Sequence, residues 1–213
     1  MTAQSIRCER TAPSPDGRRF AWCADRTISV VQSAAVSGKG FTATLPGLIN
    51  AFCWHPDGKS LIMGGEFGGL WQWFPETGET AALPGPVDQV RQLAVSATDR
   101  TLVTGDRGGR VTCWTLEGER PRYRAGSQRH HGEIYAVCLL DHGRLAVSVD
   151  EKLQVEIWRT STATQVGRLG SLPGECMHGQ DVLRLYTTPD ETRLVLMWLS
   201  TAQSVHWASW NLK

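Results

Sequence analysis

The feature that most constrains this chain of 213 residues is an internal repeat of a turn followed by short apolar segments. One full copy spans residues 54–74, where a Pro-Asp-Gly turn at 56–58 precedes an apolar run, a glycine-rich break and a second run that contains two tryptophans. Proline presets φ for such a turn, and glycine accepts the positive φ that it needs. Five aspartates mark the copies at intervals of 41, 42, 42 and 49 residues: Asp16, Asp57, Asp99, Asp141 and Asp190.

The length of the repeat predicts the architecture. About 15–17 residues after each aspartate a β-branched or aromatic run ends, at Val31, Trp73, Trp114, Trp158 and Trp207. A period of roughly 40–45 residues with this layout is typical of four-stranded propeller blades. We therefore expect an all-β chain forming a β-propeller of four-stranded antiparallel blades, with about five recognisable blades in one domain over residues 1–213. The expected blades span approximately residues 6–47, 48–86, 87–128, 129–173 and 174–213.

On these residues the chain resembles the WD40 (tryptophan–aspartate repeat) β-propeller family over nearly its whole length. The Pro-Asp-Gly turns, the Gly-Asp-Arg-Gly-Gly hairpin at 105–109, the tryptophans that end blades and the histidine-led segment 131–137 carry the resemblance. No copy ends in Trp-Asp, because Phe74, Thr115 and Arg159 follow the tryptophans. The resemblance implies that blade four contains the family's hydrogen-bonded His–Ser–Asp–Trp set, for which the candidates are His130 or His131, Ser148, Asp150 and Trp158.

The end of the chain bears on closure of the ring. Five groups of three inner strands are expected, but only four outer strands follow them, and residues 2–6 are the local segment that could supply the fifth. An open array leaves unpaired backbone edges, which favour association. Three alternatives stay open: an unusual five-bladed ring, self-association or a partner chain that completes the ring, and a piece of a longer propeller.

Composition excludes several classes. With 22 basic and 21 acidic residues the net charge is +1, so no global electrostatic argument favours nucleic acid or an anionic membrane. The segment 1–5 has no apolar core of a signal peptide, and no stretch approaches the ~18–20 apolar residues of a membrane span. We expect a cytoplasmic protein without contact to a membrane.

The chain's cysteines and histidines do not predict a metal or cofactor site. The six cysteines form no C-x-x-C pair, and four of them lie in expected strands, where free cysteine is an ordinary small core residue: Cys23, Cys53, Cys113 and Cys138. His130 and His131 with His142 lack an Asp, Glu or Cys at ligand spacing. A structural histidine at the start of blade four is favoured over a metal ligand.

Neither the repeated aspartates nor the glycines predict catalysis. The aspartates recur at the blade period in turn positions, so turn formation is favoured over acid–base chemistry. The glycine-rich segment 64–69 precedes a strand and lacks the Lys-Ser/Thr of a phosphate-binding loop, which favours a hairpin. No catalytic residue is therefore predicted.

By analogy with the family, the expected function is a non-catalytic scaffold whose face loops bind a protein or peptide partner of unknown identity. A nucleic-acid-binding propeller using the basic run 120–131 is an alternative, and an enzyme with a site in the central channel is another. Apolar inner strands argue against the enzyme. Residues 171–180, which fit no repeat, are a candidate contact loop. The candidate partner-binding residues are Arg18, Arg19, Phe67, Arg107, Arg122, Tyr123, Arg124, Arg129, Glu151 and Lys152.

Overall fold

The computed structural model describes residues 10–32, 40–66, 68–85, 88–128, 130–171, 183–188, 193–199 and 204–211. Within them the chain is all-β, as expected, and forms five antiparallel sheets. The first four sheets have four strands each and the last has three. The strands are β1 (Arg10–Pro13), β2 (Arg19–Ala24), β3 (Thr27–Gln32), β4 (Phe41–Thr44), β5 (Ile49–Trp54), β6 (Leu61–Gly65), β7 (Leu70–Trp73), β8 (Thr80–Leu83), β9 (Val90–Ser96), β10 (Thr101–Asp106), β11 (Arg110–Thr115), β12 (Arg122–Gln128), β13 (Ile134–Leu140), β14 (Leu145–Asp150), β15 (Gln154–Arg159), β16 (Thr164–Ser171), β17 (Leu183–Thr187), β18 (Arg193–Leu199) and β19 (Val205–Asn211).

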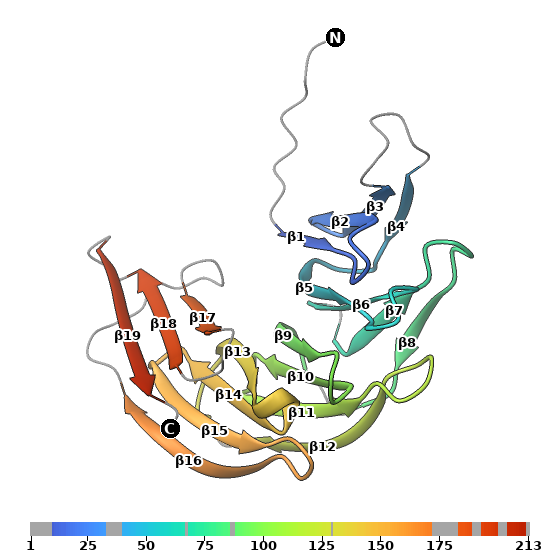
Figure 1. Ribbon diagram of the computed structural model, residues 1–213. Helices are drawn as coiled ribbons and strands as arrows, with labels where there is room; N and C mark the ends of the chain where they lie inside the picture. The colour runs from blue at the N-terminus through green and yellow to red at the C-terminus, as the bar shows by residue number, and fades with distance from the viewer. Residues whose placement is uncertain are drawn as a thin grey trace.

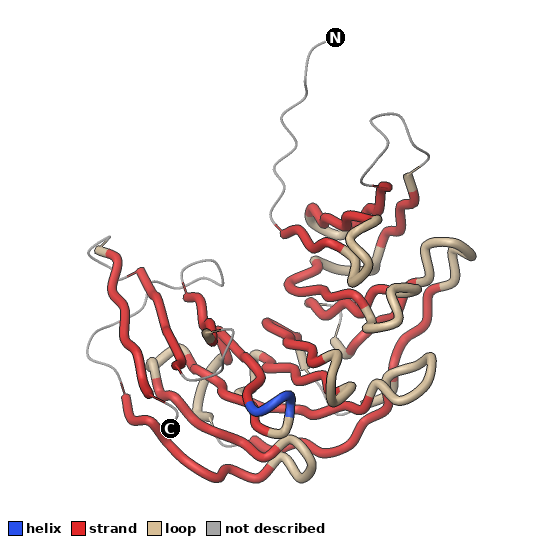
Figure 2. Tube along the Cα trace, in the orientation of Figure 1, coloured by secondary structure: helices blue, strands red, loops and turns tan. Residues whose placement is uncertain are grey.

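The five sheets are the blades of an open propeller. Each runs through its strands in chain order, and Figure 1 shows the sheets following one another round an arc, from β1–β4 at one end to β17–β19 at the other. The first strands of successive blades (β1, β5, β9, β13 and β17) contact one another along the inside of the arc. Nearly all the described chain is strand and turn, with one short 3₁₀ turn, η1 (Asp141–Gly143), between β13 and β14 (Figure 2).

The pairing register corrects one expectation. Trp73, Trp114 and Trp158 each pair across the sheet with an early residue of the preceding strand: Leu61, Leu102 and Ala146. In blade five the corresponding pair is Leu194 with Trp210, so Trp210 rather than Trp207 holds this place. The two tryptophans of β19 lie three residues apart and therefore point to opposite faces of the sheet. Trp207 lies on the outward face and is 69% exposed.

The core lies between the blades. Alternate residues of each strand point toward the preceding or the following blade, so neighbouring sheets pack face to face. Trp73 packs in a cluster with core residues of blade one, Trp114 with those of blade two and Trp158 with those of blade three. All three tryptophans are almost completely buried. Each therefore fastens its own blade to the preceding one, which makes the array of blades rigid.

Glycines near the ends of β6 and β10 permit this close approach of blades. A Cβ built on Gly105 would lie 2.4 Å from Cγ2 of Ile134, at the start of the next blade's inner strand. A Cβ built on Gly64 would likewise lie too close to the side chain of Val90, 2.5 Å from its Cγ1. We expect Gly105→Ala to lower the free energy of unfolding by about 1–3 kcal/mol, because overpacking displaces the next blade.

Urea denaturation measures this effect, with Gly167→Ala as the matched control. Gly167 lies on β16, where an added Cβ would make ordinary contacts of 3.6 Å and longer. The control should therefore be neutral or slightly stabilising. Equal stability of the Gly105 and Gly167 variants would contradict the packing between blades three and four.

Four buried cysteines lie on the strands where they were expected: Cys23, Cys53, Cys113 and Cys138. Burial raises the pKa of the thiols of Cys53 and Cys113 to about 12, so hardly any reactive thiolate forms at pH 8. We expect iodoacetamide at pH 8 to leave both unmodified in the native protein and to modify both in urea, as read by peptide mass spectrometry. Rapid native labelling of Cys113 would show that blades three and four separate readily.

Candidate functional site

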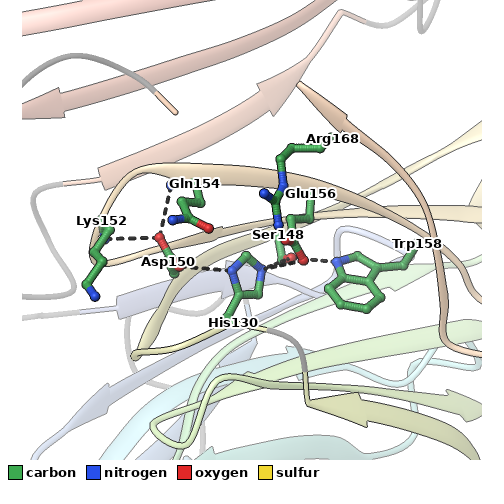
Figure 3. Close-up of polar contacts among 8 residues, drawn as sticks. All are labelled: His130, Ser148, Asp150, Lys152, Gln154, Glu156, Trp158 and Arg168. Carbon is green, nitrogen blue, oxygen red and sulfur yellow. Dashed lines mark hydrogen bonds and ion pairs between the residues drawn. The ribbon is translucent and has the colours of Figure 1, made fainter. Parts of the chain in front are cut away.

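The most highly organised polar cluster is a buried hydrogen-bond network in blade four (Figure 3). Ser148 and Asp150 lie on β14 two residues apart, so both side chains point to the same face of the sheet. Trp158 comes from the neighbouring strand β15, and His130 comes from the connection that leads into β13. Of the two candidate histidines, the structure places His130 in the network, while His131 is exposed. The resemblance therefore named Ser148, Asp150 and Trp158 correctly, and the structure selects His130 from its two candidate histidines.

The geometry identifies two of the donors in the network. His130 Nδ1 lies 3.0 Å from Asp150 Oδ2, and Nε2 lies 2.6 Å from Ser148 Oγ. Trp158 Nε1 also donates to Ser148 Oγ, at 2.6 Å. A carboxylate only accepts and an indole only donates. Nδ1 of the imidazole therefore carries a proton and donates it to Asp150, while Ser148 Oγ accepts from Trp158 and is hydrogen-bonded to Nε2.

Asp150 is held as a carboxylate in spite of its burial. Burial alone would raise its pKa, but hydrogen bonds from His130 and from the backbone N–H groups of Gln154 and Lys152 outweigh it and hold the pKa below its ordinary value. The backbone bonds to Oδ1 are 2.9 Å from Gln154 and 3.0 Å from Lys152. They tie the β14–β15 turn to the network, so this carboxylate shapes the turn as well as orienting the imidazole.

A second buried acid lies beside the network. Glu156, on β15 directly opposite Ser148, has a side chain only 1% exposed, and its Oε2 lies 3.8 Å from His130 Nε2. Its other oxygen, Oε1, accepts a hydrogen bond of 2.7 Å from Nη2 of Arg168 on β16. The guanidinium of Arg168 reaches solvent at its outer side. Sequence reasoning missed this pair, although the two-residue step from Glu156 to Trp158 signals a common face of β15.

Blade three contains a reduced version of the same arrangement. Trp114 Nε1 donates to Thr104 Oγ1 at 3.3 Å, and Asp106 accepts from the backbone N–H groups of Arg110 and Asp88. Burial is the largest influence on Asp106 and raises its pKa, against the opposing effect of these two bonds. Asp106 thus differs from Asp150, which gains a histidine donor and keeps a lowered pKa. The hydrogen bond from the histidine is therefore the main difference between the two carboxyl groups, and it favours the charged form of Asp150.

The blade-four network has the connectivity of a Ser–His–Asp triad but cannot reach a substrate. A nucleophilic serine must be accessible, with its hydroxyl proton taken up by the histidine. Here the side chains of His130 and Asp150 are 0% and 1% exposed, Ser148 is equally buried, and Trp158 occupies the serine oxygen. The network therefore lacks the accessible serine that acyl transfer needs, and its hydrogen bonds link strands and a turn of blade four.

Three of the candidate partner-binding residues lie at one end of the blades. Arg107 is in the β10–β11 turn, while Glu151 and Lys152 are in the β14–β15 turn. Arg107 is engaged between blades: its Nε lies 3.0 Å from Oε1 of Glu133, which also accepts from Arg91 of β9 at 2.9 Å. Sequence reasoning missed Arg91 and Glu133, because they are 42 positions apart in the chain and no local pattern links them. This ion-pair group joins blades three and four.

The remaining described candidates lie toward the opposite end or on an outer strand. Arg18 is exposed in the first aspartate turn. Arg19 begins β2, bonds to the carbonyl of Gly58 and to Glu76, and stacks over Trp54 at 4.9 Å, so it fastens blade one to blade two. The outer strand β12 carries the other three, Arg122, Tyr123 and Arg124. Phe67, Arg129 and residues 172–180 of the proposed contact loop lie outside the described residues.

The described residues of the basic run 120–131 do not form one continuous patch. Arg120 pairs with Glu79 of blade two, and Tyr123 makes an edge contact with Trp114, 6.0 Å between ring centroids, on the side facing blade two. Arg124 lies on the other side, toward blade four, near Cys113. Alternation along β12 therefore divides the run between two blade junctions.

Two surface hollows among the described residues lie between blades at what we call the aspartate-turn face, which carries the turns 14–18, 55–59, 97–100 and 141–144. One hollow of about 400 Å³ lies between blades two and three and includes His55, Asp57, Lys59, Arg100 and Glu119 in its lining. A second, of about 330 Å³, lies between blades three and four. Both include residues of the turn 97–100, so they are neighbours.

The turns around these hollows are fixed by hydrogen bonds. Asp57 Oδ1 accepts from the N–H of Lys59 at 2.8 Å, and Ser96 Oγ donates to the carbonyl of His142 at 2.6 Å, which joins the turns of blades three and four. Gln72 of blade two donates to the carbonyl of Glu119 in blade three at 2.7 Å. The charged side chains of this face are thus presented on a rigid frame.

No group of three or more histidine, cysteine, aspartate or glutamate side chains among the described residues is arranged to hold a metal ion. No helix in the same part of the chain has the length and apolar character needed to cross a membrane.

Comparison with known proteins adds a distant similarity. No family model matches the chain. The chain is similar to telomerase protein component 1 of Rattus norvegicus, with 30% identity over 135 residues. The matched segment covers 62% of this chain and only 5% of the rat protein. The relative is thus far longer than this chain.

Proposed function

We propose that this chain is a non-catalytic protein-interaction module that binds a protein partner on its aspartate-turn face. The observation that carries the proposal is the pair of neighbouring hollows between blades two, three and four, lined by charged side chains on hydrogen-bonded turns. Rigid presentation of polar groups lowers the entropy lost on binding. The name of the rat relative, a protein component of telomerase, supports a place in an assembly of several components.

The Ser–His–Asp geometry does not favour an enzyme over this module. Its serine is sealed by Trp158 and by the packing of blades three and four. Nucleic-acid binding is not favoured over this module either, because the described residues of the basic run are divided between two blade junctions and Arg120 is engaged with Glu79. Tight nucleic-acid binding draws on several phosphate contacts at once.

Affinity capture from the source cells tests the proposal. The tagged chain is purified with and without nuclease treatment, and bound protein and nucleic acid are both quantified. The proposal expects a protein at near-stoichiometric amount that survives nuclease treatment. Arg18→Gln serves as a probe of the aspartate-turn face, and Lys152→Gln, which removes the same charge at the other end of the blades, is the matched control. Nucleic acid without protein, or no ligand, overturns the proposal.

A further inference from the structure

The hollow between blades three and four is lined by three arginines but only two acidic residues. Three guanidinium groups line it: Arg124 from β12, Arg144 from the turn before β14, and Arg159 at the end of β15. Within the described part of the chain, the guanidinium groups of Arg124 and Arg159 make no hydrogen bond or ion pair, and that of Arg144 reaches Asp141 only at 4.0 Å. Three guanidinium groups that line one hollow from three elements, of which only that of Arg144 has an ion-pair partner among the described residues, can bind an anion together.

The residues and the volume of the hollow indicate which kind of molecule carries the anion. Two carboxylates, Asp99 and Asp141, line the same hollow. They would repel the successive phosphates of a nucleic-acid backbone but tolerate a single anionic group that has neutral or basic neighbours. Stacking of bases also needs aromatic side chains, and none lines this hollow. A volume of about 330 Å³ suits one side chain of a bound peptide rather than a folded domain.

The frame of the site is fixed. Thr160 Oγ1 lies 2.8 Å from the carbonyl of Gly143 and 3.0 Å from that of Arg144, so it ties the β15–β16 turn to the turn that carries Arg144. Ser96 holds the turn of blade three against His142. The three arginines therefore project from elements whose backbone positions are set before a ligand arrives, which reduces the cost of binding.

We propose that this hollow, lined by Arg124, Arg144 and Arg159, binds an anionic side chain, carboxylate or phosphate, within an extended segment of a partner protein. The inference rests on the proposed function and names the chemistry that the partner presents. Bidentate bonds from guanidinium groups favour phosphate, which offers more acceptor oxygens than carboxylate.

Fluorescence anisotropy with labelled peptides tests the assignment. The probes are a ten-residue glycine–alanine peptide with a central phosphoserine, the same peptide with serine, and the same peptide with glutamate. We expect the phosphoserine peptide to bind at least tenfold more tightly than the serine peptide, with glutamate between them. Inorganic phosphate should compete. Equal affinity for the three peptides, or no competition by phosphate, overturns the proposal.

Variants locate the site. Arg124→Gln and Arg159→Gln are expected each to weaken phosphoserine-peptide binding about fivefold to tenfold, because each removes one guanidinium donor. Arg26→Gln, at an exposed turn between β2 and β3, removes the same charge elsewhere and should leave affinity unchanged. Circular dichroism confirms folding of each variant. Losses that equal that of the Arg26 variant, or tighter binding of a ten-nucleotide RNA through the same arginines, contradict a peptide site here.

The outcome separates the two proposals. If affinity capture yields a protein partner that the Arg124 and Arg159 variants bind as well as the unaltered chain does, the interaction module stands and the hollow is not its anion site. If no partner is captured, the proposed function fails, whatever the peptides do.

Discussion

Replacing Trp158 with alanine is expected to lower the free energy of unfolding by about 3–5 kcal/mol. The side chain is completely buried between blades three and four, and its indole N–H donates to Ser148 Oγ. The substitution removes apolar contacts with blade three, leaves a cavity and takes one partner from a buried hydroxyl. Because folded domains are stable by only about 5–15 kcal/mol, a loss of this size shifts the urea midpoint strongly.

The same chain offers a matched control. Trp207, on the outward face of β19, is 69% exposed, and Trp207→Ala should change stability by no more than about 0.5 kcal/mol. Urea unfolding followed by far-ultraviolet circular dichroism compares both variants with the parent chain. Similar effects of the two substitutions would contradict the assignment of Trp158 as the residue that fastens blade four to blade three.

Asp150→Asn is expected to cost about 2–3 kcal/mol at pH 7, in the range of hydrogen bonds to a charged group. Asp150 uses both oxygens: Oδ2 accepts from His130 while Oδ1 accepts from the N–H groups of Lys152 and Gln154. Asparagine has a single acceptor oxygen and can serve only one side. Urea denaturation of the two proteins measures the difference, with Asp25→Asn as control at an exposed position of positive φ that asparagine also adopts.

The cost of Asp150→Asn should depend on pH in one direction. The folded-state pKa of Asp150 lies below its ordinary value of 3.8, so the carboxylate stabilises the folded chain above about pH 4. That stability is lost as the pH falls from about 4 through the folded pKa. The difference between the parent and the asparagine variant should therefore be constant near neutrality and shrink below about pH 4. A difference that grows toward acid pH would mean that Asp150 is protonated in the folded protein.

The strands could be predicted from the sequence because every copy of the repeat contains the same local signals. Each Pro-Asp-Gly or related turn is local, and each strand is a short apolar run beside it, so no long-range information is needed. The His130 network was also accessible, since the family resemblance supplies its four residue types. The spacing of 15–17 residues predicts Trp207, which lies 17 residues after Asp190, whereas Trp210 lies 20 residues after it. Only the pairing of Trp210 with Leu194 shows that Trp210 holds the place of the other tryptophans.

Contacts between blades could not be predicted in the same way. Arg107 and Arg19 lie beside turns and were expected to be free for a partner, but they bond to Glu133 and to Glu76 of a neighbouring blade. The hollow with Arg124, Arg144 and Arg159 brings together residues from three elements of two blades. Such pairings depend on how adjacent sheets pack, and no local pattern in the sequence encodes them.

The most direct test of the interaction module is hydrogen–deuterium exchange of the chain alone and with its captured partner. The proposed function predicts slower exchange on binding at the turns 97–100 and 141–144 of the aspartate-turn face and at residues 159–161, which line the hollow between blades three and four. The peptides that contain Ser148 and Asp150 should be unchanged, because the network is sealed in both states. Protection confined to the opposite end of the blades, at 106–109 and 150–153, would contradict the account and transfer the binding surface to that end.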